Sequence, residues 1–373
     1  MSNESFSATS GGQRPGVVKP FWPDRSPHFL VIRHAVRAMA QQVGQELGSG
    51  VVIGLSGGAD SLALTAGVCA EAFGAKGALA SRKVHAVVVD HQLQQGSAEV
   101  AERAAHIAQG MGATAEVIAV DINNDSDRGP EYEARLARHR VLREVAQSRG
   151  AALMLAHTLD DQAETVLLRL ARGGGPQALS AIRADLTWSD GTRILRPLLG
   201  VRRSDTQRCC GELGLKVWHD PHNQDDHYAR VRVRQTILPL LEQELGPGVA
   251  ENLAKTAAIA AVDNDFLDAH AESALNALLA EEEASACGGL PVRGVAELDD
   301  AIAVRVLARW LRRASAEPSS KQIDMIMALV HRYHGQGEVP VTRGRDDADR
   351  NARLVVERKD GTLQLVMNRP AVS

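Results

Sequence analysis

One segment of the chain reads Val51-Val52-Ile53-Gly54-Leu55-Ser56-Gly57-Gly58-Ala59-Asp60-Ser61-Leu62. Its first five residues are mostly apolar and β-branched, which favours a buried strand. A Ser-Gly-Gly turn interrupts this pattern, and apolar residues then follow at helical spacing from Leu62 to Ala70. The segment therefore predicts a strand, a tight loop and a helix in direct succession.

The loop between this strand and helix has the chemistry of an anion site. Gly57 and Gly58 lack a Cβ atom and tolerate positive φ, so their N–H groups can close around a phosphate. Ser56 and Ser61 add hydroxyl donors, and the helix N-terminus behind them favours negative charge. Asp60 would repel a phosphate unless Mg²⁺ lies between the two groups. We interpret the segment as a phosphate loop.

Known phosphate-binding patterns narrow the class of loop. The Gly-Lys-Ser/Thr ending of the Walker loop and the third glycine of the dinucleotide fingerprint are both missing. A plain strand–helix turn is the alternative, but the complete six-residue pattern is much more specific than a Gly-Gly turn. It resembles the pyrophosphate loop of the ATP pyrophosphatases, enzymes that split ATP between its α- and β-phosphates to adenylate a substrate.

Strands alternate with helices through the first part of the chain. Apolar runs predict further strands at 84–90, 115–120 and 151–156, with helices at 97–111, 130–150 and 160–172 between and after them. This alternation predicts an α/β fold with a doubly wound parallel sheet, whose ligands bind at the carboxyl ends of the strands. Polar residues follow three of the predicted strands at that end: Ser56–Ser61, Asp90-His91 and His157–Asp161.

The pattern divides the chain into three parts. Residues 1–24 are rich in Ser, Gly and Pro without a period, which predicts a disordered tail. Residues 25–225 form the predicted catalytic domain. From 226 to 373 helical periods dominate, and a few short strands close the chain, so we expect a mainly helical second domain.

Composition and charge limit the class of protein. No run approaches the roughly 20 apolar residues that cross a bilayer, and no signal layout opens the chain, so we expect a cytoplasmic protein without membrane contact. The four cysteines form no Cys-x-x-Cys pair, which argues against zinc knuckles and disulfide frameworks. The net charge of −4 argues against indiscriminate nucleic-acid binding.

Arginines nevertheless gather in places. Eight arginines and three acidic residues lie between Arg169 and Arg208. Smaller clusters occur at Arg230/Arg232/Arg234 and at Arg305/Arg309/Arg312/Arg313; the second cluster lies along one side of a predicted helix. These clusters are either solvated helix faces or a surface for an RNA backbone, and charge alone does not decide.

A group of carboxylates follows the fourth strand. Asp161 and Glu164 lie three residues apart in the helix from 160 to 172. They therefore share one face of this helix, next to its apolar face. Acids in a first turn also serve as caps and dipole partners, so a structural role is the alternative. Their position at the ligand end of the sheet, beside His157 and Asp160, favours a catalytic role.

With these segments in view, the chain resembles the tRNA(Ile)-lysidine synthetase family, of the compact form. The resemblance covers about residues 50–240 and rests on the phosphate loop and five further segments. These are Val89–Leu93, the helix with Ala134-Arg135 and Arg138, His157–Gly175, Arg196–Leu199, and Asp220–Pro239 with its Asp-Pro-x-Asn start. There are departures: Thr158 replaces the second histidine, Gln92 and Gln94 replace a glycine and an arginine, and His139 and Val231 replace an aromatic residue and an asparagine.

The resemblance implies a reaction at the wobble cytidine of a tRNA(Ile) with a CAU anticodon. The cytosine C2 oxygen attacks the α-phosphate of ATP and releases pyrophosphate, and the ε-amine of free L-lysine then attacks C2 and expels AMP. The implied catalytic residues are Asp60, Arg135, His157, Asp161 and Glu164. The implied ATP-binding residues are Ser56, Gly57, Gly58, Ala59, Asp60 and Ser61. Mg²⁺ would bind Asp60 and Asp161, lysine would bind Asp161 and Glu164, and the tRNA would bind Arg230, Arg234, Arg309 and Arg313.

Two other functions are alternatives to this one. A related tRNA thiolase would need a sulfur relay or cluster cysteines, and no Cys-x-x-Cys lies near a strand end. An RNA-binding protein without catalysis would be indicated by the loss of Asp60 or Asp161, and both are present. The sequence leaves the oligomeric state open, with a homodimer as one alternative.

Overall fold

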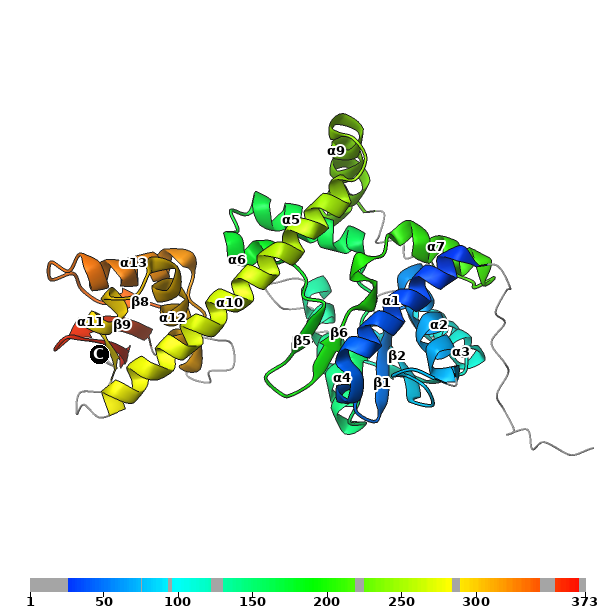
Figure 1. Ribbon diagram of the computed structural model, residues 1–373, viewed down its shortest axis with the longest axis horizontal. Coiled ribbons are helices and arrows are strands. Elements are labelled where there is room, and N and C mark those ends of the chain that lie inside the picture. Colours follow the sequence, from blue (N-terminus) through cyan, green and yellow to red (C-terminus); the bar gives the residue numbers. More distant parts are fainter. Residues whose placement is uncertain are drawn as a thin grey trace, which may run out of the picture. The chain divides into compact units, whose positions relative to one another are not determined.

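The computed structural model describes residues 26–74, 76–92, 96–121, 130–218, 225–283, 289–342 and 353–368. These residues form two compact units, which divide between Ala258 and Ile259 (Figure 1). The predicted disordered tail at 1–24 lies outside the described residues. No helix in the described ranges combines the length and the apolar character needed to cross a membrane.

The first unit contains a six-stranded sheet with the order β3-β2-β1-β4-β6-β5. All neighbouring strands are parallel except β5 and β6, which form an antiparallel pair. The predicted doubly wound sheet is therefore confirmed, although β5 was not predicted. The strands are β1 (Gly50–Leu55), β2 (Lys83–Asp90), β3 (Thr114–Ala119), β4 (Ala152–Met154), β5 (Asp185–Thr187) and β6 (Arg193–Leu195).

Helices cover both faces of this sheet because alternate side chains of each strand point to opposite faces. Val51, Ile53 and Leu55 of β1 enter the core that contains α1, α2, α3 and α7. Val52 points the other way and packs with Leu142 of α4. The helices of this part are α1 (Pro27–Val43), η1 (Gly44–Leu47), α2 (Ala59–Phe73), α3 (Ser97–Gly110), α4 (Pro130–Ser148), α5 (Leu159–Ala171), α6 (Pro176–Leu179), η2 (Pro197–Gly200) and α7 (Arg203–Glu212).

The helices that follow residue 225 belong to the first unit, which differs from the predicted boundary. Here α8 (Ala229–Arg232), the π-helical turn η4 (Val233–Ile237) and α9 (Leu238–Leu245) run on from one another. Val233 and Leu238 bury their side chains with Leu159 and Ala163 of α5. The composition changes near 225, but the apolar face of these helices is covered by the catalytic domain. The division of the chain therefore falls within the following helix, α10 (Val249–Glu283).

The second unit is mainly helical and ends in strands, as predicted. Its core contains Leu275, Leu307, Trp310 and Val356. Its small sheet has the order β7-β10-β9-β8, of which β7 was not predicted. Besides the later part of α10, the elements are β7 (Leu290–Pro291), α11 (Val292–Ala296), α12 (Asp300–Arg313), α13 (Ser320–His331), β8 (Val339–Pro340), β9 (Arg353–Lys359) and β10 (Thr362–Asn368).

Candidate active site

The loop between β1 and α2 is closed by its own serines. The Ser56 N–H donates to Ser61 Oγ at 3.2 Å, and Ser61 Oγ donates to the Gly58 carbonyl at 3.0 Å. Gly57 has φ +77°, and a Cβ atom there would lie 3.3 Å from Ala104 Cβ. A side chain at this position would therefore be strained and crowded. The predicted ATP-binding residues lie in this loop and in the first turn of α2: Ser56, Gly57, Gly58, Ala59, Asp60 and Ser61.

The three predicted catalytic carboxylates meet at one guanidinium group, that of Arg203 in the first turn of α7. Arg203 Nη2 lies 2.6 Å from Asp161 Oδ1, Nη1 lies 3.0 Å from Glu164 Oε1, and Nε lies 3.4 Å from Asp60 Oδ2. Asp60 comes from the first turn of α2, whereas Asp161 and Glu164 come from α5. The helices after the adjacent strands β1 and β4 thus bring these side chains together. The sequence did not single out Arg203.

Thr158 holds one oxygen of Asp161 in place. The Thr158 N–H donates to Asp161 Oδ2 at 2.8 Å, and Thr158 Oγ1 donates to the same oxygen at 3.0 Å. The Asp161 N–H approaches Thr158 Oγ1 at 3.4 Å, which completes a capping box at the start of α5. The residue in place of the second histidine is therefore a buried helix cap. It leaves Asp161 Oδ1 directed at Arg203.

The two aspartates of the site differ in their protonation equilibria. Burial raises the pKa of Asp60, and this effect exceeds the opposing charge of Arg203 and hydrogen bond from Thr206. Burial also acts to raise the pKa of Asp161, but the Arg203 charge and the Thr158 N–H outweigh it, so the pKa of Asp161 falls. Asp161 is therefore held ionised by its neighbours. The ionised form of Asp60 would be stabilised by a further cation entering the site.

Arg230 and Arg234 also face this cluster, although they were predicted to bind tRNA. Arg234 approaches Glu164 with Nε at 2.7 Å from Oε1 and with Nη2 at 3.1 Å from Oε2. Arg230 Nη2 donates to Thr165 Oγ1 at 3.0 Å, and its Nε lies 3.8 Å from Glu164 Oε2. These contacts arise because α8 and η4 pack against α5. Glu164, only 1% exposed, is therefore surrounded by three arginines.

Three half-buried histidines lie near the same end of the sheet. The Nδ1 atoms of His91, His139 and His157 are buried and have no hydrogen-bond partner among the described residues. Burial is the main cause that lowers the pKa of His139 to about 4 and that of His157 to about 3. Both imidazoles are thus neutral at physiological pH, so His157 can accept or donate a hydrogen bond there but carries no charge. Nearby positive charges lower both values further: Arg135, Arg138 and Arg196.

These shifts have a consequence for acid stability. Because the pKa of His139 in the folded protein is below the ordinary value of about 6.5, the unfolded chain binds more protons between these two pH values. We expect the free energy of unfolding to fall as the pH drops from about 6.5 towards about 4, and His139→Asn to reduce that loss by about 1–3 kcal/mol. Urea unfolding at several pH values would measure this. The exposed His106 on α3 offers a control, and an equal effect of His106→Asn would contradict the assignment to burial.

Comparison with known proteins identifies two families along the chain. The PP-loop domain family matches residues 32–241, and the TilS substrate binding domain family matches residues 290–363. A tRNA(Ile)-lysidine synthase of Salinispora tropica is 43% identical over 334 residues, which cover 88% of this chain and 96% of that protein.

The chain belongs to the tRNA(Ile)-lysidine synthase family. Two further relatives carry the same name. The protein of Rhodococcus erythropolis is 42% identical over 91% of this chain and 96% of its own length. That of Leifsonia xyli subsp. xyli is 44% identical over 78% of this chain and 84% of its own length. Membership of the tRNA(Ile)-lysidine synthase family confirms the resemblance, and the thiolase alternative is less supported. The family's Asp-Pro-x-Asn segment, residues 220–223, lies outside the described residues.

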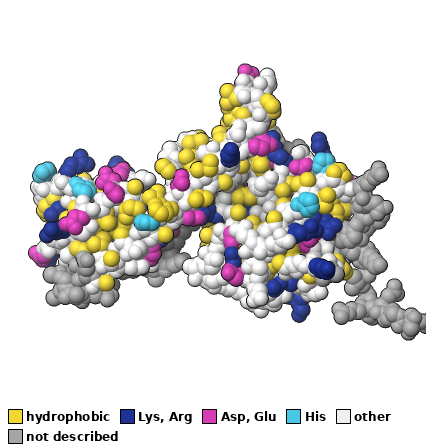
Figure 2. Space-filling model, in the orientation of Figure 1, with side chains coloured by type: hydrophobic (Ala, Val, Ile, Leu, Met, Phe, Trp, Pro, Cys, Tyr) yellow, Lys and Arg dark blue, Asp and Glu magenta, His cyan; other side chains and the backbone are white. Residues whose placement is uncertain are grey.

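In this member of the tRNA(Ile)-lysidine synthase family, the arginines of α12 pair with acids of α10. Arg309 Nη1 lies 2.7 Å from Glu272 Oε2, and Arg313 Nη2 lies 2.5 Å from Glu272 Oε1. Arg305 Nε lies 3.2 Å from Asp268 Oδ1. On the face drawn in Figure 2, basic side chains of this unit are interspersed with acidic ones. The predicted helix with these arginines is confirmed, but the acids that balance their charge come from another helix.

Charge reversal on α12 should therefore affect stability first. We expect Arg309→Glu with Arg313→Glu to destabilise the second unit by about 1–3 kcal/mol, because both new carboxylates would face Glu272. Thermal unfolding measures this. Arg312→Glu, at an exposed position on the same helix, should leave the melting temperature nearly unchanged. A double variant as stable as the parent would show that the pairs contribute nothing and that Arg309 and Arg313 are available to a ligand.

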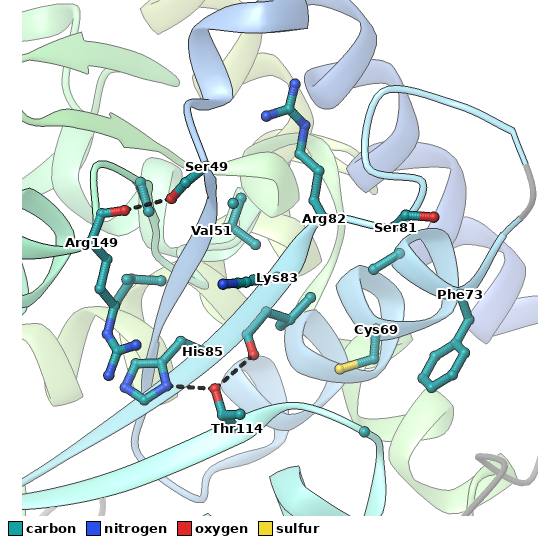
Figure 3. A pocket seen from close by; sticks show the side chains of 16 residues that line it. Ser49, Val51, Cys69, Phe73, Ser81, Arg82, Lys83, His85, Thr114 and Arg149 are labelled. Atoms are coloured by element: carbon teal, nitrogen blue, oxygen red, sulfur yellow. Dashed lines mark hydrogen bonds between the residues drawn. The ribbon is translucent and has the colours of Figure 1, made fainter. Parts of the chain in front are cut away.

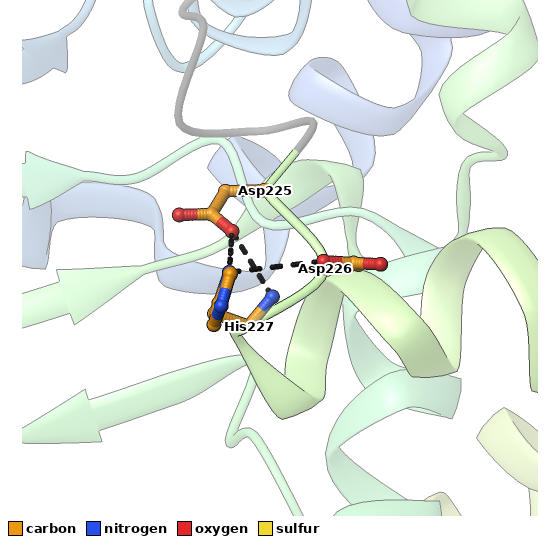
Figure 4. A group of neighbouring side chains, drawn as sticks. All are labelled: Asp225, Asp226 and His227. Carbon is orange, nitrogen blue, oxygen red and sulfur yellow. Dashed lines mark hydrogen bonds and ion pairs between the residues drawn. The ribbon is translucent and has the colours of Figure 1, made fainter.

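Two other features lie away from the carboxylate cluster. A cavity of about 680 Å³ opens at the amino ends of β1 and β2, beside Lys83, Arg82 and Arg149 (Figure 3). Ligands of such sheets bind at the opposite, carboxyl ends. Asp225 and His227 lie next to each other before α8, with 2.8 Å between Oδ1 and Nδ1, and Asp226 is nearby (Figure 4). The imidazole is exposed, and acids gathered at a surface are common without a metal. We assign neither feature a role in the reaction.

Proposed function

We propose that this chain ligates free L-lysine to C2 of the wobble cytidine in the CAU anticodon of tRNA(Ile), with ATP converted to AMP and pyrophosphate. The observation that supports this most strongly is the convergence of Asp60, Asp161 and Glu164 beside the phosphate loop. The reaction needs groups for a leaving pyrophosphate and for cations at one place, and the loop and the carboxylates supply both. Cys69, Cys209 and Cys210 are buried, which does not favour a sulfur relay.

The first step forms an adenylated cytidine. The cytosine C2 oxygen attacks the α-phosphate, and the bond from this phosphorus to pyrophosphate breaks. The N–H groups of Gly57 and Gly58 and the hydroxyls of Ser56 and Ser61 would stabilise the charge that builds on the leaving group. The Arg135 guanidinium would face the α-phosphate or the cytosine oxygen.

Asp60 and Asp161 would hold Mg²⁺. Their carboxylates share one cationic partner, so oxygen ligands from two segments can reach a single positive charge. Carboxylate oxygens are ligands that Mg²⁺ prefers, and the donor set therefore fits the ion. When bound, Mg²⁺ would supply charge neutralisation at the phosphates.

The second step uses the two acids of α5. Asp161 and Glu164 would bind the lysine ammonium, and one carboxylate must accept a proton because only the neutral amine is a nucleophile. The amine then attacks C2, and the bond from C2 to the oxygen of AMP breaks.

We infer that the second unit contacts the tRNA. Arg309 and Arg313 could do so only if Glu272 releases them. We also infer that the enzyme works in the cytoplasm.

Pyrophosphate release from the purified protein tests this function. Release should require ATP, Mg²⁺ and a transcript of tRNA(Ile) with the CAU anticodon, and lysine should be consumed in equal amount with AMP formed. A methionine tRNA transcript with the same anticodon is the control, and it should give no lysine incorporation. Incorporation of lysine into both transcripts, or into neither, would contradict the proposed substrate.

A further inference from the structure

Arg203 lies where acidic side chains from two helices meet, and it is itself largely buried. Its side chain is 17% exposed, and those of Asp60, Asp161 and Glu164 are 25%, 11% and 1% exposed. Each of the three guanidinium nitrogens, Nε, Nη1 and Nη2, faces a different carboxylate. The backbone of Arg203 is also held, because its N–H donates to Asp160 Oδ2 at 2.7 Å. The side chain is therefore fixed at both ends.

The charges of the cluster do not balance without this residue. Glu164 has Arg234 as a second close partner at 2.7 Å. Asp161 has Arg234 only at 3.5 Å, and Asp60 has Arg203 as its one cationic partner in the described part of the chain. Without Arg203, two largely buried carboxylates would repel each other across the place where its guanidinium now lies.

We propose that Arg203 is a positioning residue and the resident counter-cation of Asp60, Asp161 and Glu164, and that the cations of the reaction replace it. A divalent ion between Asp60 and Asp161 and an ammonium between Asp161 and Glu164 would use the same carboxylate oxygens. The identity of these incoming cations rests on the proposed function. The triphosphate of ATP would offer the displaced guanidinium a new partner beside the phosphate loop, so metal binding should depend on nucleotide.

Binding of Mn²⁺ to the nucleotide-free protein tests this directly. Mn²⁺ serves as the probe because its free form is counted by electron paramagnetic resonance. Arg203→Gln should bind Mn²⁺ about ten-fold more tightly than the parent, because the competing charge is gone. Arg202→Gln is the matched control. Arg202 is the preceding residue and also contacts three acids, Asp160, Glu242 and Glu251, but none of the cluster, so its loss should leave Mn²⁺ affinity unchanged.

A purely structural role for Arg203 would give the opposite result. Loosened carboxylates would bind Mn²⁺ more weakly or equally, and that outcome in Arg203→Gln overturns the proposal. If this variant does not fold, Arg203→Lys is measured instead. One ammonium cannot face three carboxylates, so the lysine should compete less well with Mn²⁺ than the arginine does, and Mn²⁺ affinity should rise by a smaller factor. No rise in affinity overturns the proposal. At saturating lysine, kcat should fall in Arg203→Gln and partly recover in Arg203→Lys. The Mn²⁺-binding measurement needs neither tRNA nor lysine, so its failure is distinct from failure of the parent to make lysidine.

Discussion

Asp60→Asn is expected to reduce pyrophosphate release by about 10²–10³-fold while tRNA affinity stays within about two-fold of the parent. The change removes a negative charge from the loop and with it a ligand proposed for Mg²⁺. Asparagine can still accept the hydrogen bond that Thr206 Oγ1 donates to Asp60 Oδ1, so the local fold should persist. Rapid-quench measurement of pyrophosphate and filter binding of the transcript give the two quantities.

The matched control for this variant is Asp205→Asn. Asp205 lies on α7, close to the site in sequence, but its carboxylate pairs with His28 at 2.8 Å and not with the cluster. It should release pyrophosphate at nearly the parent rate. If tRNA affinity fell in Asp60→Asn as much as activity, the residue would serve RNA binding and its assignment to phosphate and metal would be wrong.

Glu164→Gln should separate the two chemical steps. We expect the KM for lysine to rise by about 10²-fold or more, because the variant loses the buried charge proposed to bind the ammonium. Adenylation should continue, so an adenylated tRNA should accumulate and be trapped by rapid quench. The unfolding midpoint should also fall, since Arg203, Arg230 and Arg234 would lose their shared carboxylate.

A second buried glutamate provides the control for that loss of stability. Glu71 on α2 is 7% exposed, and both Arg33 and Arg37 of α1 contact it at 2.8 Å. Glu71→Gln should lower stability in a similar way and leave the KM for lysine unchanged. If adenylation stopped in Glu164→Gln but not in Glu71→Gln, Glu164 would belong to the metal site and the division of roles between it and Asp161 would be wrong.

The parts of the site that lie in continuous segments could be predicted from sequence. The glycines and serines of the phosphate loop mark the turn between β1 and α2, and the helical spacing of α5 places Asp161 and Glu164 together on one face beside the apolar face. Arg203 could not be found in this way. It is one of many arginines in its region, and its carboxylate partners are 39 to 143 positions away.

Counting charges along the chain failed where the balancing charge lies on another element. Arg230 and Arg234 were predicted to bind tRNA because only the charges near them in the sequence could be compared, yet Glu164 lies against them after folding. Arg309 and Arg313 looked unbalanced for the same reason, and α10 supplies Glu272. The domain boundary shows a related limit, because a change of composition marks where strands end and not where packing ends.

The π-helical turn η4, Val233–Ile237, places a limit on how this stretch can change in evolution. One residue removed from a helix turns everything after it by about 100°. Arg230 before the turn and Arg234 within it contact Glu164, while Leu238 after it packs with Leu159. A deletion within the turn could restore a regular α-helix, but it would rotate Leu238 away from α5 or move the arginines off Glu164. The number of residues between Arg230 and Leu238 should therefore be constant among functional relatives, even where the residues themselves vary.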